Sequence, residues 1–310
     1  MFCCVIGGGG FIGRRLVHEL IGTGREILVV GRQKEPPKGF PARAKYVFGD
    51  YGDRAFLKRI LVQCDEVINL AYATVPQTSY VDPMFDLQAN LPPSVGLLEI
   101  ARDIQTLRSI LIVSSGGTVY GQSERLPISE DAQTTPVSPY GITKLTIERY
   151  GLMFHKLHGI PVKIARPSNA YGSGQKPFIG QGFIATAIGH IYRGNEVLIF
   201  GEKGTIRDYI HVRDVSSGIV AILDQGKVGE VYNIGSGIGR DNRSVLDLIE
   251  SFARIDGYLV RVRIEPARNF DVPANVLNYG KLLACSGWMP KVSFESGIAE
   301  MWQEGFLKQP

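Results

Sequence analysis

The chain lacks the patterns that mark several classes of protein. Its four cysteines form no C-x-x-C pair and no metal-ligand spacing, so we expect free, mostly buried thiols and no metal site. None of its apolar runs approaches the roughly 18–20 residues that cross a bilayer. Lys and Arg are scattered among acids at a net charge of +4, without the basic stripe typical of nucleic-acid binding. With no signal peptide recognisable before the first apolar run, these absences predict a cytoplasmic protein.

Short apolar runs alternate with helical patterns through the first 165 residues. Because these runs show almost no polar alternation, they predict strands buried on both faces of a parallel sheet. Alternating strands and helices are typical of a Rossmann-type, doubly wound α/β fold. The expected strands are Phe2–Ile6, Ile27–Val30, Lys45–Phe48, Glu66–Leu70, Ser109–Val113 and Val162–Ala165. The expected helices are Phe11–Leu20, Arg54–Gln63, Ser94–Arg102 and Tyr140–Leu157.

The alternation ends after about residue 170, where loops punctuated by Gly and Pro separate isolated helices and short strands. We therefore expect a dinucleotide-binding domain over residues 1–170 and a smaller, irregular α/β lobe over residues 171–310 that binds the substrate. The chain is expected to cross between them. In such folds the ligand lies at the carboxyl ends of the strands.

Glycines at positions 7, 10 and 13 directly follow the first apolar run. At a strand-to-helix turn, this spacing lets backbone N–H groups approach a pyrophosphate, and the helix N-terminus adds partial positive charge. Glycine-rich turns also occur in loops that bind nothing. The pattern indicates a dinucleotide site only together with further motifs downstream.

Tyr140 and Lys144 lie four residues apart just after a proline-marked helix start, and so on one helical face. An ammonium group beside a phenol favours the phenolate and is expected to lower its pKa from near 10. Such a tyrosine can take a proton from a hydroxyl as hydride leaves the carbon, and can return it in reverse. With 13 tyrosines in the chain, this spacing can arise by chance, so the neighbouring motifs decide its meaning.

Further motifs follow the glycine turn in a fixed order along nearly the whole chain. Together with Tyr140 and Lys144, their order resembles the extended short-chain dehydrogenase/reductase superfamily. Within it the chain is most similar to the sugar-nucleotide epimerases, in particular the UDP-hexose 4-epimerases. These motifs are Ser114–Gly121, Arg166–Gly172, Phe200–Val215, Tyr232–Gly237 and Gly287–Pro290.

The resemblance implies roles for individual residues. Tyr140 would be the acid/base catalyst, and Lys144 its partner and a ligand of the nicotinamide ribose. Asp50 would meet the adenine amino group. The substrate diphosphate would contact Asn169, Arg207 and Arg268, and guanidinium groups suit phosphate through their paired donors. The other implied cofactor ligands are Gly7, Gly10, Phe11, Ile12, Gly13, Arg32, Tyr51, Leu70, Ala71, Asn90 and Ser114.

The chain departs from this family at three positions. Where the epimerases carry a catalytic Ser or Thr it has Gly116. We expect Thr118, or else Ser115, to supply the hydroxyl, and the remaining alternative is that Tyr140 acts almost alone. Where NAD-preferring members carry an acid it has Arg32, which keeps NADP as an alternative. NAD is still expected, because an epimerase restores its own cofactor and needs no supply of reductant. Where the family has a bulky gatekeeper it has Asn275, which predicts room for an N-acetyl group at C2 of the sugar.

The resemblance therefore predicts an NAD-dependent 4-epimerase of a diphosphate-linked sugar, acting by transient oxidation at C4. UDP-GlcNAc/UDP-GalNAc is the expected pair, with UDP-Glc/UDP-Gal as a second pair. We also expect a homodimer and a place in polysaccharide biosynthesis.

Three alternatives stay open at the level of the sequence. Arg32 favours an NADPH-dependent reductase of a keto-sugar nucleotide, a polyprenyl-diphosphate-linked sugar would suit the same arginines, and Gly116 is compatible with a silent dinucleotide-binding regulator. A 4,6-dehydratase is disfavoured, because Gly116-Gly117-Thr118 lacks the Asp-Glu pair of those enzymes.

Overall fold

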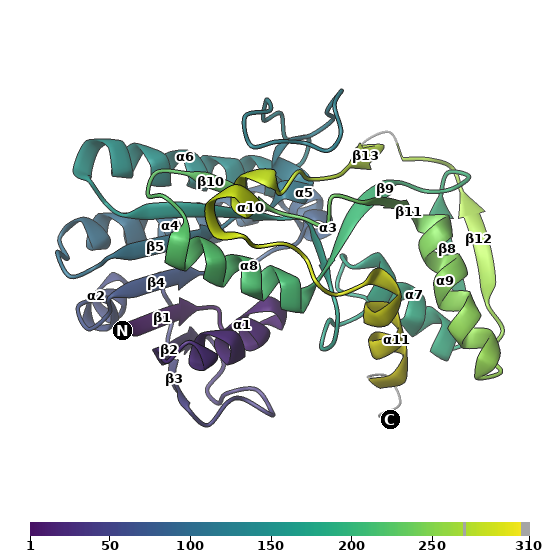
Figure 1. Cartoon of the computed structure of the whole chain (residues 1–310), viewed down its shortest axis with the longest axis horizontal. Helices are drawn as coiled ribbons and strands as arrows, with labels where there is room; N and C mark the ends of the chain where they lie inside the picture. Colours follow the sequence, from purple (N-terminus) through teal and green to yellow (C-terminus); the bar gives the residue numbers. More distant parts are fainter. Residues whose placement is uncertain (269–270, 305–310) are drawn as a thin grey trace.

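A seven-stranded sheet organises the computed structural model, which describes residues 1–268 and 271–304 (Figure 1). Its order is β10-β6-β5-β4-β1-β2-β3, and every neighbouring pair is parallel. Along β1, Cys4 and Ile6 enter the core on one face while Cys3 and Val5 enter the core on the other, which confirms burial on both faces. The strands are β1 (Phe2–Ile6), β2 (Glu26–Gly31), β3 (Ala44–Phe48), β4 (Glu66–Asn69), β5 (Ser109–Val113), β6 (Val162–Pro167) and β10 (Val231–Ile234).

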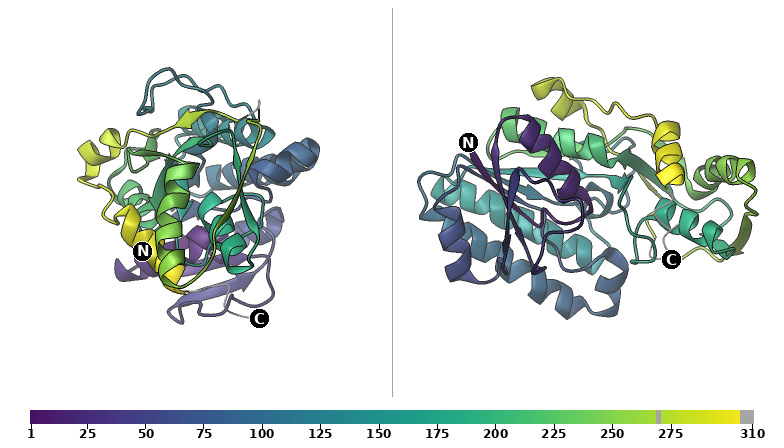
Figure 2. Two further views of the ribbon diagram at one scale, coloured as in Figure 1. Left: turned by 90° about the vertical axis from the view of Figure 1, so that its right-hand side faces the viewer. Right: turned by 90° about the horizontal axis from the view of Figure 1, so that it is seen from below.

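Helices cover both faces of this sheet, as expected for a doubly wound fold (Figure 2). Leu57, Leu97 and Ile147 fill the core on one face, and Leu16 and Ile219 fill the core on the other. The first face carries α2 (Arg54–Leu61), α4 (Pro83–Arg102) and α6 (Pro139–His158). The second face carries α1 (Phe11–Gly22) and α8 (Val212–Gln225), with α10 (Gly280–Ser286) packed on α8.

The second lobe holds two small sheets and its own apolar core. Ile188, Val197, Ile249 and Met301 are fully buried in that core. Its strands are β7 (Asn169–Tyr171), β8 (Glu196–Phe200), β9 (Ile206–His211), β11 (Gly239–Asp241), β12 (Arg261–Glu265) and β13 (Ala274–Asn275). Its helices are α7 (Phe183–Tyr192), α9 (Asn242–Ile255) and α11 (Phe294–Glu304).

The chain passes more than once between the two lobes. After β9 in the second lobe it returns as α8 and β10, and β10 pairs with β6 at the edge of the large sheet. It then runs back through β11 and α9 before α10 packs on α8 again. Residues beyond 170 therefore build one edge and part of one face of the first lobe.

The main difference from the predicted elements lies in α4. A helix was expected over Ser94–Arg102, but α4 already begins at Pro83, where Asp82 accepts a hydrogen bond from the Phe85 N–H at 2.9 Å. Pro92 and Pro93 stand inside it. Proline removes a backbone donor and normally ends a helix, which is why the pattern upstream of Pro92 predicted no helix.

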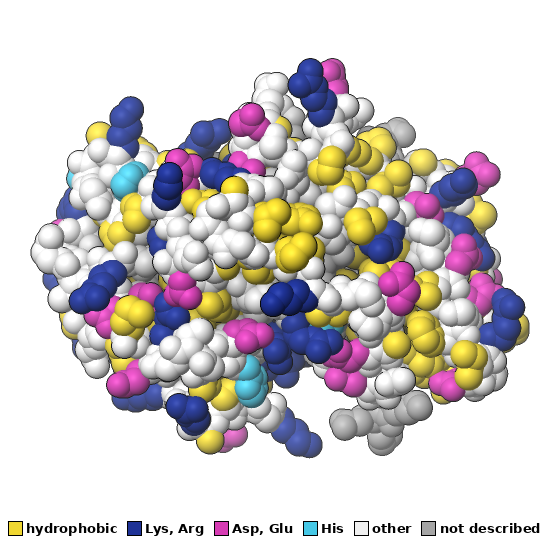
Figure 3. Space-filling view, in the orientation of Figure 1, with side chains coloured by type: hydrophobic (Ala, Val, Ile, Leu, Met, Phe, Trp, Pro, Cys, Tyr) yellow, Lys and Arg dark blue, Asp and Glu magenta, His cyan; other side chains and the backbone are white. Residues whose placement is uncertain are grey.

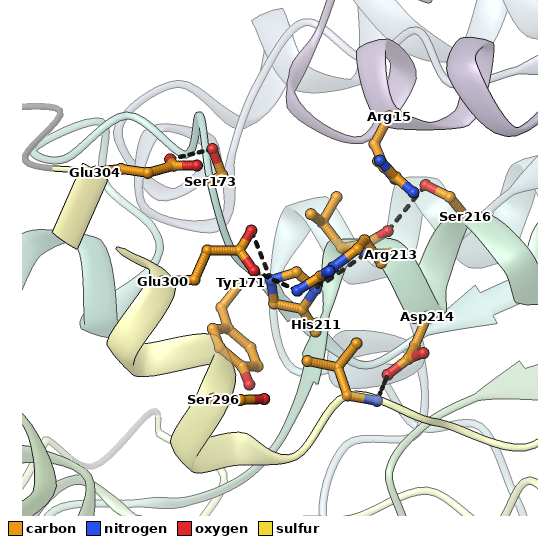
Figure 4. Close-up of polar contacts among 12 residues, drawn as sticks. Arg15, Tyr171, Ser173, His211, Arg213, Asp214, Ser216, Ser296, Glu300 and Glu304 are labelled. Atoms are coloured by element: carbon orange, nitrogen blue, oxygen red, sulfur yellow. Dashed lines mark hydrogen bonds and ion pairs between the residues drawn. The ribbon is translucent and has the colours of Figure 1, made fainter. Parts of the chain in front are cut away.

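Polar contacts hold α11 against α8 at the joint between the lobes (Figure 4). Glu300 forms an ion pair with Arg213, and its carboxylate lies 3.9 Å from Nε2 of His211. Burial, together with the charges of Arg213 and Arg15, lowers the His211 pKa to about 4. The imidazole is therefore neutral near pH 7 and accepts a hydrogen bond from the Arg213 N–H through Nδ1.

Charges of both signs are mixed over the face seen in Figure 3, where Lys and Arg stand beside Asp and Glu. This agrees with the mild net charge of +4. Among the helices in the described part of the chain, none combines the length and the apolar character needed to cross a membrane.

Candidate active site

A cavity of about 500 Å³ lies where the carboxyl ends of β1, β4, β5 and β6 face the second lobe. The turn before α1 and the start of α6 supply its walls on one side, and β9 and the β7–α7 loop supply them on the other. Many of the residues expected at the site meet here. These are Gly7, Gly10, Phe11, Ile12, Gly13, Leu70, Ser114, Ser115, Thr118, Tyr140, Lys144, Asn169 and Arg207.

The glycine turn is closed too tightly for side chains. Gly7 has φ +82°, and a Cβ there would lie 2.9 Å from the backbone nitrogen of Ala71. A Cβ at Gly13 would lie 2.6 Å from the Gly7 carbonyl oxygen, so glycine allows α1 to pack directly on the turn. Gly10 caps α1, whose first turn carries no acidic residue. The helix N-terminus therefore faces the cavity with its N–H groups and positive end, which suits a pyrophosphate.

Several of the expected cofactor ligands lie outside the cavity wall. Arg32 is exposed after β2, Asp50 is exposed and accepts a hydrogen bond from the Gly52 N–H, and Tyr51 is half-buried nearby. Ala71 lies behind Gly7, where its N–H donates to Asn69.

Asn90 is buried beneath the wall rather than in it. Its Oδ1 accepts a hydrogen bond from the Ala73 N–H at 2.7 Å, and its Nδ2 donates to the Asp86 carbonyl. Asn90 therefore fixes the segment after β4, in which Leu70 and Tyr72 line the cavity.

Tyr140 and Lys144 lie side by side at the start of α6. Ser138 caps this helix by accepting the Gly141 N–H, and Pro139 occupies its first position. Lys144 Nζ donates to the Val113 carbonyl at 2.9 Å and lies 5.7 Å from the centre of the Tyr140 ring. The expected pair therefore meets at the end of β5.

The two groups titrate differently from the expectation. Burial, together with the charge of Asp86, raises the Tyr140 pKa above its ordinary value, and a hydrogen bond with Ser115 acts in the opposite direction. Burial lowers the Lys144 pKa to about 7, with Glu148 and Asp86 opposing that shift. In the protein alone, burial and the charge of Asp86 thus shift the Tyr140 pKa in the direction opposite to the lowering expected from an adjacent ammonium group.

The missing hydroxyl at position 116 has a packing explanation. A Cβ at Gly116 would lie 2.4 Å from Leu277 Cδ1 and 3.0 Å from the Arg166 carbonyl oxygen. Gly116 begins α5 (Gly116–Val119) and packs against Leu277, whereas Ser115 and Thr118 line the cavity. The Ser115 hydroxyl lies near enough to the Tyr140 phenol to favour its ionised form, while the Thr118 hydroxyl contacts the Ser115 carbonyl at 3.4 Å. This geometry favours Ser115 over Thr118, against the order expected from the sequence.

The expected diphosphate residues divide into two groups. Asn169 and Arg207 line the cavity, and Arg207 is anchored by donating to the Val272 carbonyl at 2.7 Å. Burial lowers the Arg207 pKa from its ordinary value. Arg268 lies outside the lining residues, 2.8 Å from the Asp271 carboxylate and over the Phe200 ring.

Asn275, the expected gatekeeper, is buried behind the cavity wall. Its side chain is 1% exposed and donates to the Gly116 carbonyl at 3.1 Å. The Asn275 side chain therefore does not line the cavity.

Other lining residues were not expected from the sequence. Tyr72 and Thr74 follow β4, Gln175 follows β7, and Asp271 precedes β13. Tyr72 and Thr74 lie at the same edge of the sheet as the expected site. Their position directly after an apolar strand could therefore have predicted their place in the cavity wall. Asp271 comes from a loop that no periodic pattern positions.

Three cavity-lining polar atoms are buried without a protein partner within the described residues. They are the hydroxyls of Ser114 and Ser168 and the Oε1 of Gln175. Buried polar groups nearly always have partners, so these atoms suit a polar ligand. With the side-chain-free glycine turn, they make the cavity fit a dinucleotide and a sugar diphosphate.

A model of the NAD dependent epimerase/dehydratase family matches residues 3–235. The UDP-glucose 4-epimerase of Thermotoga maritima, solved with UDP-glucose, is 32% identical, has a TM-score of 0.90 and covers 99% of each chain. The Thermus thermophilus UDP-glucose 4-epimerase, solved with NAD, is 29% identical with a TM-score of 0.89 and covers 100% of each chain. A dTDP-glucose 4,6-dehydratase of Xanthomonas campestris is 29% identical over 98% of this chain and 95% of that protein.

These similarities confirm the Rossmann-type fold and the expected membership of the extended dehydrogenase/reductase superfamily. They also confirm NAD as the expected cofactor, since the matching family is defined as NAD dependent. The match spans far more than half of the sequence. The chain belongs to the NAD dependent epimerase/dehydratase family.

Proposed function

We propose that this chain is a 4-epimerase of UDP-linked sugars. The observation that carries the proposal is the meeting of Tyr140, Lys144 and Ser115 at one cavity wall, beside the glycine turn and across from Arg207. An acid/base phenol, a dinucleotide turn and an anion-binding side chain are the three parts that this reaction needs. The solved UDP-glucose 4-epimerases named above support the same choice.

Residues of the glycine turn, with Leu70 and Ser114, would hold NAD against the ends of β1, β4 and β5. When bound, NAD supplies a reversible hydride acceptor for C4 of the sugar. The protein's part is to orient the two reactants and exclude water from them.

Tyr140 takes the proton of the C4 hydroxyl and returns it after the sugar presents its other face. The Ser115 hydroxyl lies beside the phenol and is placed to share that proton. The Lys144 ammonium favours the phenolate, as does the positive charge of an oxidised nicotinamide. Asn169 and Arg207 anchor the diphosphate, so that the sugar can turn while its carrier stays bound.

UDP-GlcNAc and UDP-GalNAc are the proposed preferred pair. The support is the position of Asn275, which is not among the residues that line the cavity because its side chain is turned to the Gly116 carbonyl. Asn275→Tyr is expected to slow the N-acetyl sugars more than the plain hexoses, because a larger side chain must project into the cavity. Equal losses with both classes would contradict the assignment.

The alternatives have less support. Arg32, which favoured an NADPH-dependent reductase, is exposed and outside the cavity lining. The similarity to a dTDP-glucose 4,6-dehydratase supports a dehydratase, but Gly116-Gly117-Thr118 supplies no carboxylate beside Tyr140. A polyprenyl-diphosphate sugar remains the alternative carrier.

The test is to mix the purified protein with UDP-GlcNAc or UDP-glucose, without added cofactor, and to follow the anomeric protons by NMR. The expected result is a fixed ratio of the two C4 epimers with both substrates, reached sooner with UDP-GlcNAc. Turnover that consumes added NADPH stoichiometrically would instead identify a reductase. If no UDP sugar reacts, the proposed function is wrong for these carriers, and a lipid-linked diphosphate sugar is tested next.

We also propose that α4 and α6 pair with the same helices of a second copy. They pack side by side, and their outer faces carry exposed apolar side chains. A homodimer mass by light scattering supports this arrangement, and a monomer at micromolar concentration contradicts it. The exposed side chains are Met84, Phe85 and Leu87 on α4 and Ile142, Tyr150, Met153 and Leu157 on α6.

A further inference from the structure

A fully buried carboxylate lies beneath the segment that follows β4. Asp86, on α4, is 0% exposed. Its Oδ1 accepts hydrogen bonds from the Thr74 hydroxyl and, at 3.3 Å, from the Tyr72 hydroxyl. Both donors also line the cavity. A buried charge is costly unless its surroundings compensate it, so the presence of the Asp86 carboxylate at this depth requires an explanation.

Tyr72 lies between this carboxylate and the proposed catalytic pair. Its ring faces Lys144 Nζ, which is 4.1 Å from the ring centre, and meets the Tyr140 ring edge-on at 4.8 Å. The Tyr72 hydroxyl also contacts the Tyr140 carbonyl at 3.4 Å. One side chain therefore touches Asp86, Lys144 and Tyr140 at the same time.

The surroundings of Lys144 explain why such support is needed. Nζ is buried and donates to the Val113 carbonyl of β5. The charged groups that face it are Glu148 from its own helix and Asp86 from α4, and Glu148 is itself paired with Arg166 of β6. Burial opposes the ammonium form, whereas the two carboxylates and an aromatic face favour it.

We propose that Tyr72 and Asp86 are positioning residues that keep Lys144 charged and hold it beside Tyr140. Tyr72 presents its ring to the ammonium group, and Asp86 supplies negative charge behind the ring and fixes the hydroxyl. This inference rests on the proposed function, in which Tyr140 is the acid/base and Lys144 is its partner.

The sign of the effect follows from the charges. Removing the negative charge of Asp86 disfavours the Lys144 ammonium and eases ionisation of Tyr140, so the pKa values of both groups fall. Because turnover needs the Tyr140 phenolate and the Lys144 ammonium, both limbs of the turnover–pH profile are expected to move to lower pH. If Asp86 only supported the fold, its replacement would lower turnover at every pH without moving the profile along the pH axis.

The direct test is an NMR titration of protein labelled with ¹³C at the lysine ε carbons, with and without added NAD. The Lys144 signal is the one lost in Lys144→Met. In the protein without NAD its midpoint is expected at about 7. Asp86→Asn and Tyr72→Leu are each expected to lower the midpoint by about one unit. Tyr72→Phe keeps the aromatic face and should stay closer to the wild type.

Glu99→Gln is the matched control, because Glu99 is an exposed carboxylate on the same helix. It should leave the midpoint and the turnover–pH profile unchanged. An unchanged midpoint in both Asp86→Asn and Tyr72→Leu would overturn the inference. If Asp86→Asn fails to fold, an unchanged midpoint in Tyr72→Leu suffices to reject it.

The titration needs no substrate, so its result separates the two proposals. A shifted midpoint in a protein that turns over no sugar nucleotide supports the positioning roles and leaves the proposed function wrong. Epimerisation with an unmoved midpoint supports the function and rejects the positioning roles.

Discussion

Ser115 and Thr118 present two hydroxyl groups to the same cavity, but their bonding differs. The Ser115 hydroxyl lies near enough to the Tyr140 phenol to favour its ionised form, whereas the Thr118 hydroxyl contacts the carbonyl of its own turn. We expect Ser115→Ala to reduce turnover by about 10²-fold or more, since the proton path loses a partner. Thr118→Ala should stay within about threefold of the wild type by the same reasoning. A larger loss in Thr118→Ala, measured by steady-state kinetics, would reverse the assignment.

Gly116→Ser supplies the residue type that the resemblance to the epimerases implies at this position, yet we expect it to be harmful. Its Cβ would overlap Leu277, which costs about 1–3 kcal/mol of unfolding free energy by overpacking. Denaturant unfolding measures this loss, and turnover should not rise. Gly22→Ser is the control, because no atom lies within 4 Å of its Cβ position. A gain in turnover would show that position 116 reaches the substrate.

At the scale of elements, α6 is tied to β6 by a buried ion pair. Arg166 Nη2 lies 2.6 Å from Glu148 Oε2, and the two side chains are 4% and 1% exposed. Removing one partner leaves a buried charge, so Glu148→Leu should cost about 3–5 kcal/mol in chemical unfolding. Adding Arg166→Met should recover part of that loss, because the orphaned charge is gone.

The half-exposed pair of Arg15 and Glu19 on α1 provides the control for this cycle. Glu19→Leu should change the unfolding free energy by less than about 1 kcal/mol. If the single and double variants at Glu148 and Arg166 are equally unstable, the buried pair does not anchor the helix as described.

Sequence patterns predicted the elements that obey a simple period. The apolar runs of the central strands were placed within a residue or two, and the start of α6 followed from Pro139. The first half of α4 was missed because Pro92 and Pro93 hide it. Tyr72 was missed because it follows a strand within an irregular segment, where contacts and not periodicity decide the direction of a side chain.

The choice between Ser115 and Thr118 depended on a detail that no pattern carries. It depends on how α5 packs against Leu277, a residue more than 150 positions further along the chain. The glycine turn and the Tyr140–Lys144 pair were predictable because their spacing alone brings the groups together.

At the scale of the whole molecule, the buried Lys144 makes stability depend on pH. Its folded-state pKa of about 7 lies below that of an exposed lysine, so the unfolded chain binds an extra proton above pH 7. The cost of burying Lys144 is therefore full below pH 7 and is relieved as the pH rises. Lys144→Met should be more stable than the wild type by a few kcal/mol near pH 7, and by less at pH 9 (about 1.4 kcal/mol per pKa unit).

Comparing the two proteins at each pH cancels the other groups that titrate. Urea unfolding at several pH values between 6 and 9 gives the difference directly. A difference that does not shrink with rising pH would show that Lys144 titrates normally in the folded protein.

The central claim is that Tyr140 serves an epimerisation at C4 that passes through transient oxidation. The measurement that tests it most directly is NMR of UDP-GlcNAc or UDP-glucose turnover in D₂O, with wild type and Tyr140→Phe. We predict C4 epimers that retain protium at every sugar carbon, because the hydrogen leaves and returns as hydride, and a loss of about 10²–10⁴-fold in Tyr140→Phe. Deuterium bound to a sugar carbon of the product, or full turnover by Tyr140→Phe, would contradict the account.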